Sequence, residues 1–255
     1  MQIEGNLFIV TGGASGLGED VARHLVQQGA FVSIFDINQE RAESIVNELG
    51  QEKCFSPGLT DVTQEANVIE SMSRTLAHFS QIALAGAILC SGIVHPPKSL
   101  EGYGDQKALT SFAQFEHVIK VNLLGTYCVA QKVAEQLVSN QPFNQDQEKG
   151  IIITASSMLG LDGALVGYGT SKAGIIGFTL PMARELASHG IRVMSIAPGP
   201  FDTPMVDRNA STPTPTALFP SRYGAPAEFT QLVVEIIRNR MLNGSVIRLD
   251  GALRV

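Results

Sequence analysis

Residues 11–18 read T-G-G-A-S-G-L-G and directly follow the apolar run Leu7-Phe8-Ile9-Val10. A strand, a glycine-rich turn and a helix start, in this order, form a cradle for phosphate groups, because backbone N–H groups and the positive end of the helix dipole face the ligand. In such a cradle Gly12 allows the tight turn, Gly16 lets the backbone approach a pyrophosphate, and Gly18 lets the helix pack closely on the strand. The stretch predicts a nucleotide-binding strand–helix–strand unit.

A carboxylate stands where such a unit needs one. Asp36 follows the next apolar run, residues 31–35. A carboxylate about 20 residues beyond the glycines accepts hydrogen bonds from the hydroxyls of the adenosine ribose. It would also repel a 2′-phosphate, and the glycine turn contains no arginine or lysine that could neutralise that phosphate. We therefore expect NAD as the cofactor in preference to NADP.

Short β-branched runs alternate with amphipathic helical patterns along the whole chain. Strands are predicted at 6–11, 31–36, 53–57, 84–90, 150–155, 191–197 and 245–249, and helices at 16–28, 39–49, 65–78, 112–139, 167–188 and 227–239. This alternation predicts a parallel sheet covered by helices on both faces. No linker or repeat interrupts the pattern, so residues 1–255 are expected to form a single α/β, doubly wound, Rossmann-like domain with a seven-stranded parallel sheet.

Composition restricts the partners. Of the 255 residues, 44% are hydrophobic and 16% are charged, which indicates a globular chain. The net charge of −6 argues against nucleic acid or an anionic membrane as a partner. The longest apolar stretch, residues 82–94, is too short to span a bilayer.

The cysteines indicate a compartment. Cys54, Cys90 and Cys128 have neither disulfide nor zinc-site spacing, so we expect buried, reduced thiols and no metal site. The first predicted strand begins almost at once, which leaves no room for a targeting segment. A cytoplasmic protein is expected, or one of the mitochondrial matrix if a transit peptide has been removed.

Tyr168 and Lys172 stand four residues apart at the start of a predicted helix, so their side chains share one face. A nearby ammonium favours the phenolate and makes tyrosine a usable acid or base. Ser156 and Ser157 follow the predicted strand 150–155, and ligands of open parallel sheets bind at the carboxyl ends of strands. A serine hydroxyl there can hold a substrate carbonyl, although helix capping or turn formation would also account for either serine.

Together these motifs resemble the short-chain dehydrogenase/reductase family from about residue 5 to 253. The resemblance rests on T-G-G-A-S-G-L-G, Asp61-Val62, Lys120-Val121-Asn122, Ser157, Tyr168-Gly-Thr-Ser-Lys172 and Ile196-Ala-Pro-Gly-Pro200. Residues 177–186, 219–229 and 242–252, with the long insertion at 95–115, resemble the type II 3-hydroxyacyl-CoA dehydrogenase branch.

The resemblance implies roles for four catalytic residues. Tyr168 would be the general acid/base, and Lys172 would bind the nicotinamide ribose and lower the pKa of Tyr168. Ser157 would polarise the substrate oxygen. Asn122 would support a water-linked proton path to Lys172, with helix packing as the alternative reading.

The resemblance also implies contacts with NAD. Besides the three glycines and Asp36, these are Ser15 and Leu17 at the pyrophosphate, Asp61 and Val62 at the adenine, Cys90 at the adenosine side, and Phe201 and Thr203 over the nicotinamide. A core position is the alternative for Phe201.

The sequence departs from the family pattern at several places. Leu89 stands where the family has an asparagine that braces the sheet, and the Ser157–Tyr168 spacing is about two residues shorter than usual. The shortening falls between Gly163 and Tyr168. The stretch 82–86 is about two residues longer than usual and lacks an aspartate, while the segment 200–224 is about four residues shorter than in the type II branch. We expect these changes to alter loop geometry more than chemistry.

The function that the resemblance implies is reversible hydride transfer between NAD and a 3-hydroxyacyl-CoA, in a homotetramer. Alternatives are a hydroxysteroid or short-chain alcohol dehydrogenase, a 3-oxoacyl carrier-protein reductase, and a non-catalytic nucleotide-sensing protein.

The insertion 95–115 and the segment 200–224, a candidate lid, are expected to border the substrate mouth. Apolar side chains of the lid would cover an acyl chain, and basic side chains would meet CoA phosphates. These residues are Phe201, Met205, Leu218 and Phe219 for the acyl chain, and Lys98, Arg208 and Arg222 for the phosphates.

Overall fold

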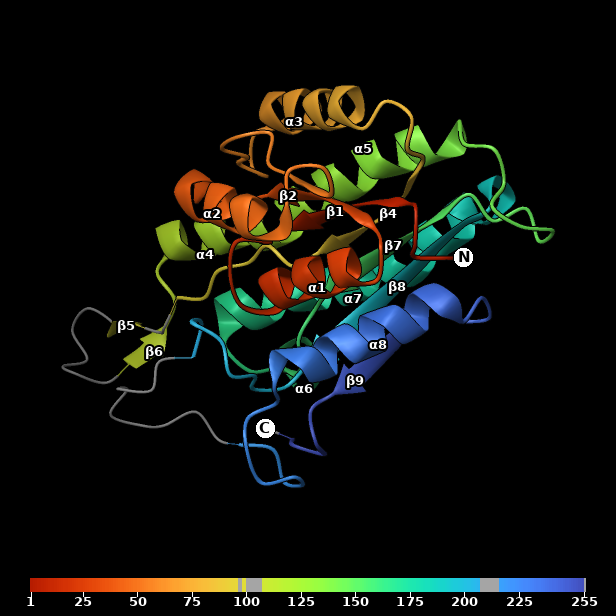
Figure 1. The fold of residues 1–255 in the computed structure, drawn as a ribbon. Coiled ribbons are helices and arrows are strands. Elements are labelled where there is room, and N and C mark those ends of the chain that lie inside the picture. The colour runs from red at the N-terminus through yellow and green to blue at the C-terminus, as the bar shows by residue number, and fades with distance from the viewer. Residues whose placement is uncertain (96–97, 100–106, 207–215, 255) are drawn as a thin grey trace.

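In the computed structural model, the described residues are 1–95, 98–99, 107–206 and 216–254. A central sheet runs through the molecule with helices on both sides (Figure 1). It contains seven strands in the order β3-β2-β1-β4-β7-β8-β9, and each neighbouring pair is parallel. Their bounds are β1 Leu7–Thr11, β2 Phe31–Phe35, β3 Cys54–Phe55, β4 Leu84–Leu89, β7 Gly150–Ala155, β8 Ile191–Pro198 and β9 Val246–Leu249. The predicted doubly wound fold is confirmed.

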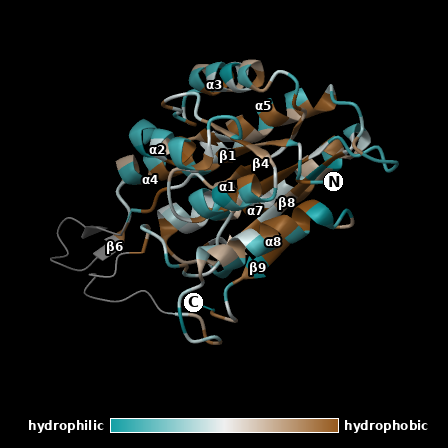
Figure 2. Ribbon diagram, viewed as in Figure 1, coloured by the Kyte–Doolittle hydropathy of each residue, from teal (hydrophilic) through white to brown (hydrophobic). Residues whose placement is uncertain are grey.

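The helices cover the sheet in two layers. They are α1 Gly16–Gln27, α2 Gln39–Leu49, α3 Glu65–His78, α4 Phe112–Val118, α5 Thr126–Val138, α6 Met158–Asp162, α7 Val166–Leu186 and α8 Pro226–Arg238. One apolar cluster joins one face of the sheet to α1, α2 and α8, and a second joins the opposite face to α3, α5 and α7. Figure 2 shows hydrophobic colour on the central strands and hydrophilic colour on much of α2 and α3.

Alternation along the strands produces these two clusters. In β1, Phe8 and Val10 belong to the cluster with α1 and α8, whereas Leu7 and Ile9 belong to the cluster with α3 and α5. Successive side chains of a strand point to opposite faces, so a fully apolar strand fills both layers. The strand order reverses between β1 and β4, and a sheet of this type binds ligands at that point, beyond the carboxyl ends of its strands.

The structure differs from the sequence prediction in four local features. The predicted helix 112–139 is interrupted by a π-helical segment, η1 (Ile119–Gly125), between α4 and α5. The short helix α6 and the antiparallel strands β5 (Lys98–Ser99) and β6 (Lys107–Leu109) were not predicted. The strand predicted at 53–57 pairs only over Cys54–Phe55, because Pro57 has no N–H to donate to a neighbouring strand. In the described part of the chain, no helix is long and apolar enough to cross a membrane.

Two glycines give a test of the packing. A Cβ at Gly86, in β4, would overlap the carbonyl oxygen of Ile151, whereas a Cβ at Gly177, in α7, would meet nothing within 4 Å. We expect Gly86→Ala to lower the free energy of unfolding by about 1–3 kcal/mol. Gly177→Ala should raise it by about 0.5–1 kcal/mol, because alanine favours the helix and restricts the unfolded chain. Urea unfolding of both variants measures the difference, and a change of the same sign in both would contradict this packing.

Candidate active site

Two cavities lie next to each other at the carboxyl ends of the strands. The glycine-loop cavity has a volume of about 620 Å³, and the tyrosine cavity one of about 480 Å³. Their shared wall consists of Leu17, Cys90, Gly92, Thr203 and Met205. The first cavity is lined by Gly12, Ser15, Gly16, Leu17, Gly18, Asp36, Asp61, Val62, Cys90 and Thr203, so the structure brings together every predicted NAD contact outside the tyrosine cavity. The second is lined by Ser157, Tyr168, Lys172 and Phe201.

The glycine turn has the geometry that the sequence predicts. Gly12 and Gly16 have φ angles of 64° and 53°, in the left-handed region that favours glycine. A Cβ at Gly12 would lie 2.9 Å from the backbone nitrogen of Ser91, and one at Gly18 would overlap the carbonyl oxygen of Gly12. Ser15, at the N-cap of α1, makes no side-chain capping bond, so it leaves the first N–H groups of the helix for a ligand. This turn therefore fits a dinucleotide pyrophosphate.

Asp36 lies at the carboxyl end of β2 and is oriented by two backbone groups. Its Oδ2 accepts a hydrogen bond from the Ala14 nitrogen at 3.0 Å, and its Oδ1 accepts one from the Asn38 nitrogen at 2.9 Å. Each carboxylate oxygen can accept a further bond, so two ribose hydroxyls can still be bound.

The arginines on the neighbouring helices are engaged elsewhere. Arg23 of α1 pairs with Glu19 and Glu48, and Arg41 of α2 also pairs with both glutamates. These pairs neutralise the guanidinium groups that could otherwise attract a 2′-phosphate.

The two candidate serines differ in what their hydroxyls do. Ser156 Oγ donates to the Ile196 carbonyl at 2.9 Å and accepts from Ser195 Oγ at 2.9 Å, so it ties β7 to β8. Ser157 Oγ lies beside the Tyr168 hydroxyl and lowers the pKa of that group, and it accepts from the Leu159 nitrogen at 3.2 Å, which caps α6. Capping and contact with the tyrosine thus coexist in Ser157, and this geometry favours Ser157 over Ser156 as the catalytic serine.

Burial controls the ionisation of Tyr168 and Lys172. It raises the pKa of Tyr168 to about 12, against the opposing effect of the Ser157 hydrogen bond. Burial lowers the pKa of Lys172 to about 8. Lys172 Nζ donates to the Ala155 carbonyl at 2.7 Å and lies 5.6 Å from the centre of the Tyr168 ring. The expectation that Lys172 lowers the pKa of Tyr168 stays a prediction, because the shift of this pKa arises from burial and from Ser157.

Asn122 lies in the π-helical segment η1 and is fully buried. Its Nδ2 donates to the Ile93 carbonyl at 2.9 Å and to Ser171 Oγ at 3.0 Å, and its Oδ1 accepts from the Ile93 nitrogen at 2.8 Å. A Cβ at Gly92 would lie 3.3 Å from Lys172 Nζ and 3.4 Å from Asn122 Oδ1, so the two side chains flank this glycine. Asn122 thus has a packing role between η1, Ile93 and Ser171, and it also lies close to Lys172.

Cys90 lies in the wall between the two cavities and not only on the adenosine side. Burial raises the pKa of its thiol to about 12, so the sulfur is neutral there. Phe201 is buried, and its ring packs edge-on to Phe229 with 6.4 Å between the ring centroids. Its ring is therefore a core aromatic, as the alternative reading had it, while the residue still borders the tyrosine cavity.

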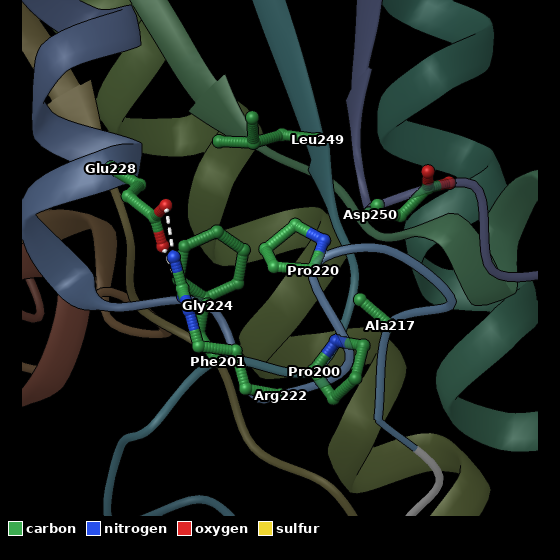
Figure 3. A pocket seen from close by; sticks show the side chains of 10 residues that line it. Pro200, Phe201, Ala217, Pro220, Arg222, Gly224, Glu228, Leu249 and Asp250 are labelled. Atoms are coloured by element: carbon green, nitrogen blue, oxygen red, sulfur yellow. Dashed lines mark hydrogen bonds and ion pairs between the residues drawn. The ribbon is translucent and has the colours of Figure 1, made fainter.

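The lid contributes fewer contacts than expected. Met205 lines the tyrosine cavity, but Leu218 and Phe219 are exposed and are not among its lining residues. Arg222 forms two 2.8 Å bonds with Glu228, beside a separate cavity of about 180 Å³ that Phe201 also borders (Figure 3). These three residues do not line the tyrosine cavity as expected, because Leu218 and Phe219 bond the Gly251 carbonyl and Arg222 pairs with α8.

The structure does not describe the side chains of the other two predicted phosphate contacts. Arg208 and the side chain of Lys98 lie outside the described residues. Val94, the residue that precedes the insertion, lines the tyrosine cavity. Within the insertion, Thr110 lies 3.3 Å from the position that a Cβ at Gly167 would take. Thr110 of the insertion thus packs against the start of α7, and the expected place of the insertion at the substrate mouth stays a prediction.

Sequence reasoning missed several apolar residues of the tyrosine cavity. They are Val94, Met158, Leu159, Leu165, Val206 and Leu253. None carries a chemical signal, and Leu253 reaches the site only because the C-terminal segment folds back onto it. The short spacing between Gly163 and Tyr168 was the one signal that pointed at Leu165.

Comparison with known proteins agrees with this geometry. The sequence model described as short chain dehydrogenase matches residues 6–214. The chain is 40% identical to 3-hydroxyacyl-CoA dehydrogenase type-2 of Bos taurus, over 99% of this chain and 97% of that protein. A crystal structure of 3-hydroxyacyl-CoA dehydrogenase type-2 from Mycobacterium avium superposes with a TM-score of 0.88 at 33% identity, covering 98% of this chain and 96% of that one. The 3-ketoacyl-(acyl-carrier-protein) reductase of Brucella melitensis, crystallised with NADH, shares the fold with a TM-score of 0.86 at 24% identity, and the two chains are covered completely.

The lowered pKa of Lys172 predicts a stability profile. Burial holds this pKa at about 8, whereas the usual value is 10.5, so between these pH values the unfolded chain binds a proton that the native state does not. The free energy of unfolding should therefore rise from pH 8 to 10.5, by up to ~3 kcal/mol from this group. Lys172→Met should lack that rise. Urea unfolding of both proteins across this range gives the difference, and parallel pH profiles would contradict the assignment.

Proposed function

Because the chain belongs to the short-chain dehydrogenase family and is an oxidoreductase acting on CH–OH groups, we propose that it oxidises a 3-hydroxyacyl-CoA reversibly with NAD. The observation that carries this proposal is the shared wall of the two cavities: a dinucleotide cradle lies on one side, and Ser157, Tyr168 and Lys172 lie on the other.

The three side chains divide the work on the substrate oxygen. When bound, NAD supplies the hydride acceptor. Ser157 Oγ would hold the oxygen beside the Tyr168 hydroxyl, whose pKa it already lowers. In ketone reduction, a tyrosine with a raised pKa is protonated and ready to donate. In alcohol oxidation the phenolate must form first, so the reaction gains from any positive charge on Lys172 and from the Ser157 hydrogen bond.

Lys172 and Asn122 provide the proton path in this proposal. A lysine with a pKa near 8 exchanges protons readily at neutral pH. Asn122 fixes the backbone at Ile93, next to the glycine that separates it from Lys172. Through this contact Asn122 would keep a water path to the lysine open.

The tyrosine cavity supports an extended, mostly apolar substrate. Its wall includes Met158, Leu159, Met205, Val206 and Leu253. The similarity to 3-hydroxyacyl-CoA dehydrogenase type-2 supports a thioester in particular. A hydroxysteroid, a short-chain alcohol or a carrier-protein thioester would also contact such a wall. A nucleotide sensor is disfavoured, since it would not need the three catalytic side chains.

Assembly and compartment follow from the same proposal. We propose a homotetramer, supported by the family and by exposed apolar side chains at Leu124, Leu180 and Met241. The free thiols of the three cysteines support a reducing compartment, either the cytoplasm or the mitochondrial matrix.

One assay tests the substrate and the cofactor. The kcat/KM of a short 3-hydroxyacyl-CoA should exceed that of the matching free hydroxy acid and that of a hydroxysteroid, because the thioester can fill the apolar wall and the mouth together. The value with NAD should exceed that with NADP, since Asp36 repels a 2′-phosphate. A better rate with the steroid or the free acid would exclude the acyl-CoA assignment, and equal rates with NADP would exclude the role of Asp36.

The proton donor has its own test. Tyr168→Phe should lower kcat by ~10²–10⁴ while the Kd for NADH, from fluorescence titration, stays unchanged. Tyr127, which is exposed on α5 and packs against Phe178, provides the matched control, and Tyr127→Phe should keep full turnover. Ser157→Ala should lower kcat more than Ser156→Ala. Near-normal turnover in Tyr168→Phe would make that tyrosine structural.

A further inference from the structure

The turn between α6 and α7 holds a leucine in an unusual backbone conformation. Leu165 has φ 59° and ψ 90°, in a region that L-residues with branched side chains rarely adopt. It is the N-cap of α7, three residues before Tyr168, and makes no capping bond with its side chain. Glycine or asparagine would occupy such a position at lower energetic cost.

The shortness of the connection produces this conformation. Gly163 ends α6 with φ 81°, and α7 begins at Val166, so only Ala164 and Leu165 join them. The nitrogens of Gly163 and Ala164 both donate to the Leu159 carbonyl, at 3.1 and 3.2 Å.

The turn is also fixed from the side of α7. The Ala164 carbonyl oxygen packs onto the backbone of Gly169, where a Cβ would overlap it. The Leu165 carbonyl then accepts from the Gly169 nitrogen at 2.6 Å. The chain must turn left-handed at Leu165 to satisfy both ends.

This conformation carries the Leu165 side chain to the mouth of the tyrosine cavity. Leu165 lines the cavity with Ser157 and Tyr168, and 37% of its surface stays exposed. A leucine here is therefore disfavoured twice, by its backbone and by its contact with water. Strained residues of this kind concentrate where a binding site requires a particular side chain.

We propose that Leu165 determines substrate size, closing the tyrosine cavity at its mouth and limiting the bulk of the chain next to the reacting carbon. The inference rests on the proposed oxidation of a secondary alcohol and deepens it by naming the side chain that sets the size limit. The catalytic side chains would be unaffected by shortening Leu165.

The test compares Leu165→Gly and Leu165→Ala with the parent protein on two substrate series of rising chain length, 3-hydroxyacyl-CoA thioesters and 2-alkanols. The ratio of kcat/KM for the longest to the shortest member should rise about 10-fold or more in both variants, the effect of one or two methylene groups in an apolar pocket. Leu165→Asn tolerates the left-handed conformation but adds a polar group, so it should raise the KM of the long members.

Gln147 provides the matched control. It also has a positive φ, 61°, and is exposed outside the tyrosine cavity, so Gln147→Gly relieves the same kind of backbone strain without touching the site. The length ratio should stay within twofold of the parent value in that variant. An unchanged ratio in Leu165→Gly and Leu165→Ala, or an equal rise in Gln147→Gly, would overturn the inference.

Binding distinguishes a failure of this inference from a failure of the proposed function. Titration calorimetry measures the Kd of 2-alkanones of rising length without any turnover. In the Leu165→Gly and Leu165→Ala variants, the affinity for the longest alkanone should rise relative to that for the shortest. If the parent protein oxidised only the alkanols, the acyl-CoA proposal would fail and the alkanol ratios would decide the role of Leu165. If it oxidised neither series, the alkanone affinities would decide it.

Discussion

The backbone contact between the glycine turn and the end of β4 is the constraint on which both cavities depend. Gly12 lies so close to Ser91 that a Cβ would come within 2.9 Å of its nitrogen, and Gly18 packs directly on the carbonyl of Gly12. These contacts bring the N-terminus of α1 beside the carboxyl ends of β1 and β4, where the strand order reverses. The wall that separates the dinucleotide cradle from Tyr168 exists only because of this close approach.

Burial shifts the pKa values of Tyr168 and Lys172 in opposite directions and thereby favours the neutral form of both groups. The phenol of Tyr168 is pushed toward its neutral form and the amine of Lys172 also toward its neutral form, so neither group carries a charge easily. The Ala155 carbonyl orients Lys172 by accepting a hydrogen bond, and Ser157 lies beside the Tyr168 hydroxyl. A buried pair of this kind responds strongly to any new charge brought into the cavity, because a low dielectric screens it weakly.

Hydrogen bonds brace the chain behind the site. Leu89 is buried in the apolar layer with α3 and α5. At the end of β4 the Thr11 carbonyl accepts from the Cys90 nitrogen, and the Thr11 hydroxyl accepts from the Ser91 nitrogen at 3.2 Å. On the far side, the widened turn of η1 lets Asn122 reach Ile93 and Ser171 together, an arrangement typical of π-helical segments at functional sites.

The sequence by itself determined the sheet, its helices and the chemistry of the site. Apolar strands such as 7–11 and 150–155, and the motifs around Gly12, Asp36 and Tyr168, act through local spacing and strand ends, which a linear pattern preserves. Tertiary structure alone decided that Ser156 ties β7 to β8 while Ser157 lies beside the tyrosine, that burial raises the pKa of Tyr168, and that Leu218 and Phe219 do not line the tyrosine cavity. Each of these outcomes depends on desolvation or on contacts between segments far apart in the chain. A pattern of neighbouring residues reveals neither desolvation nor such contacts.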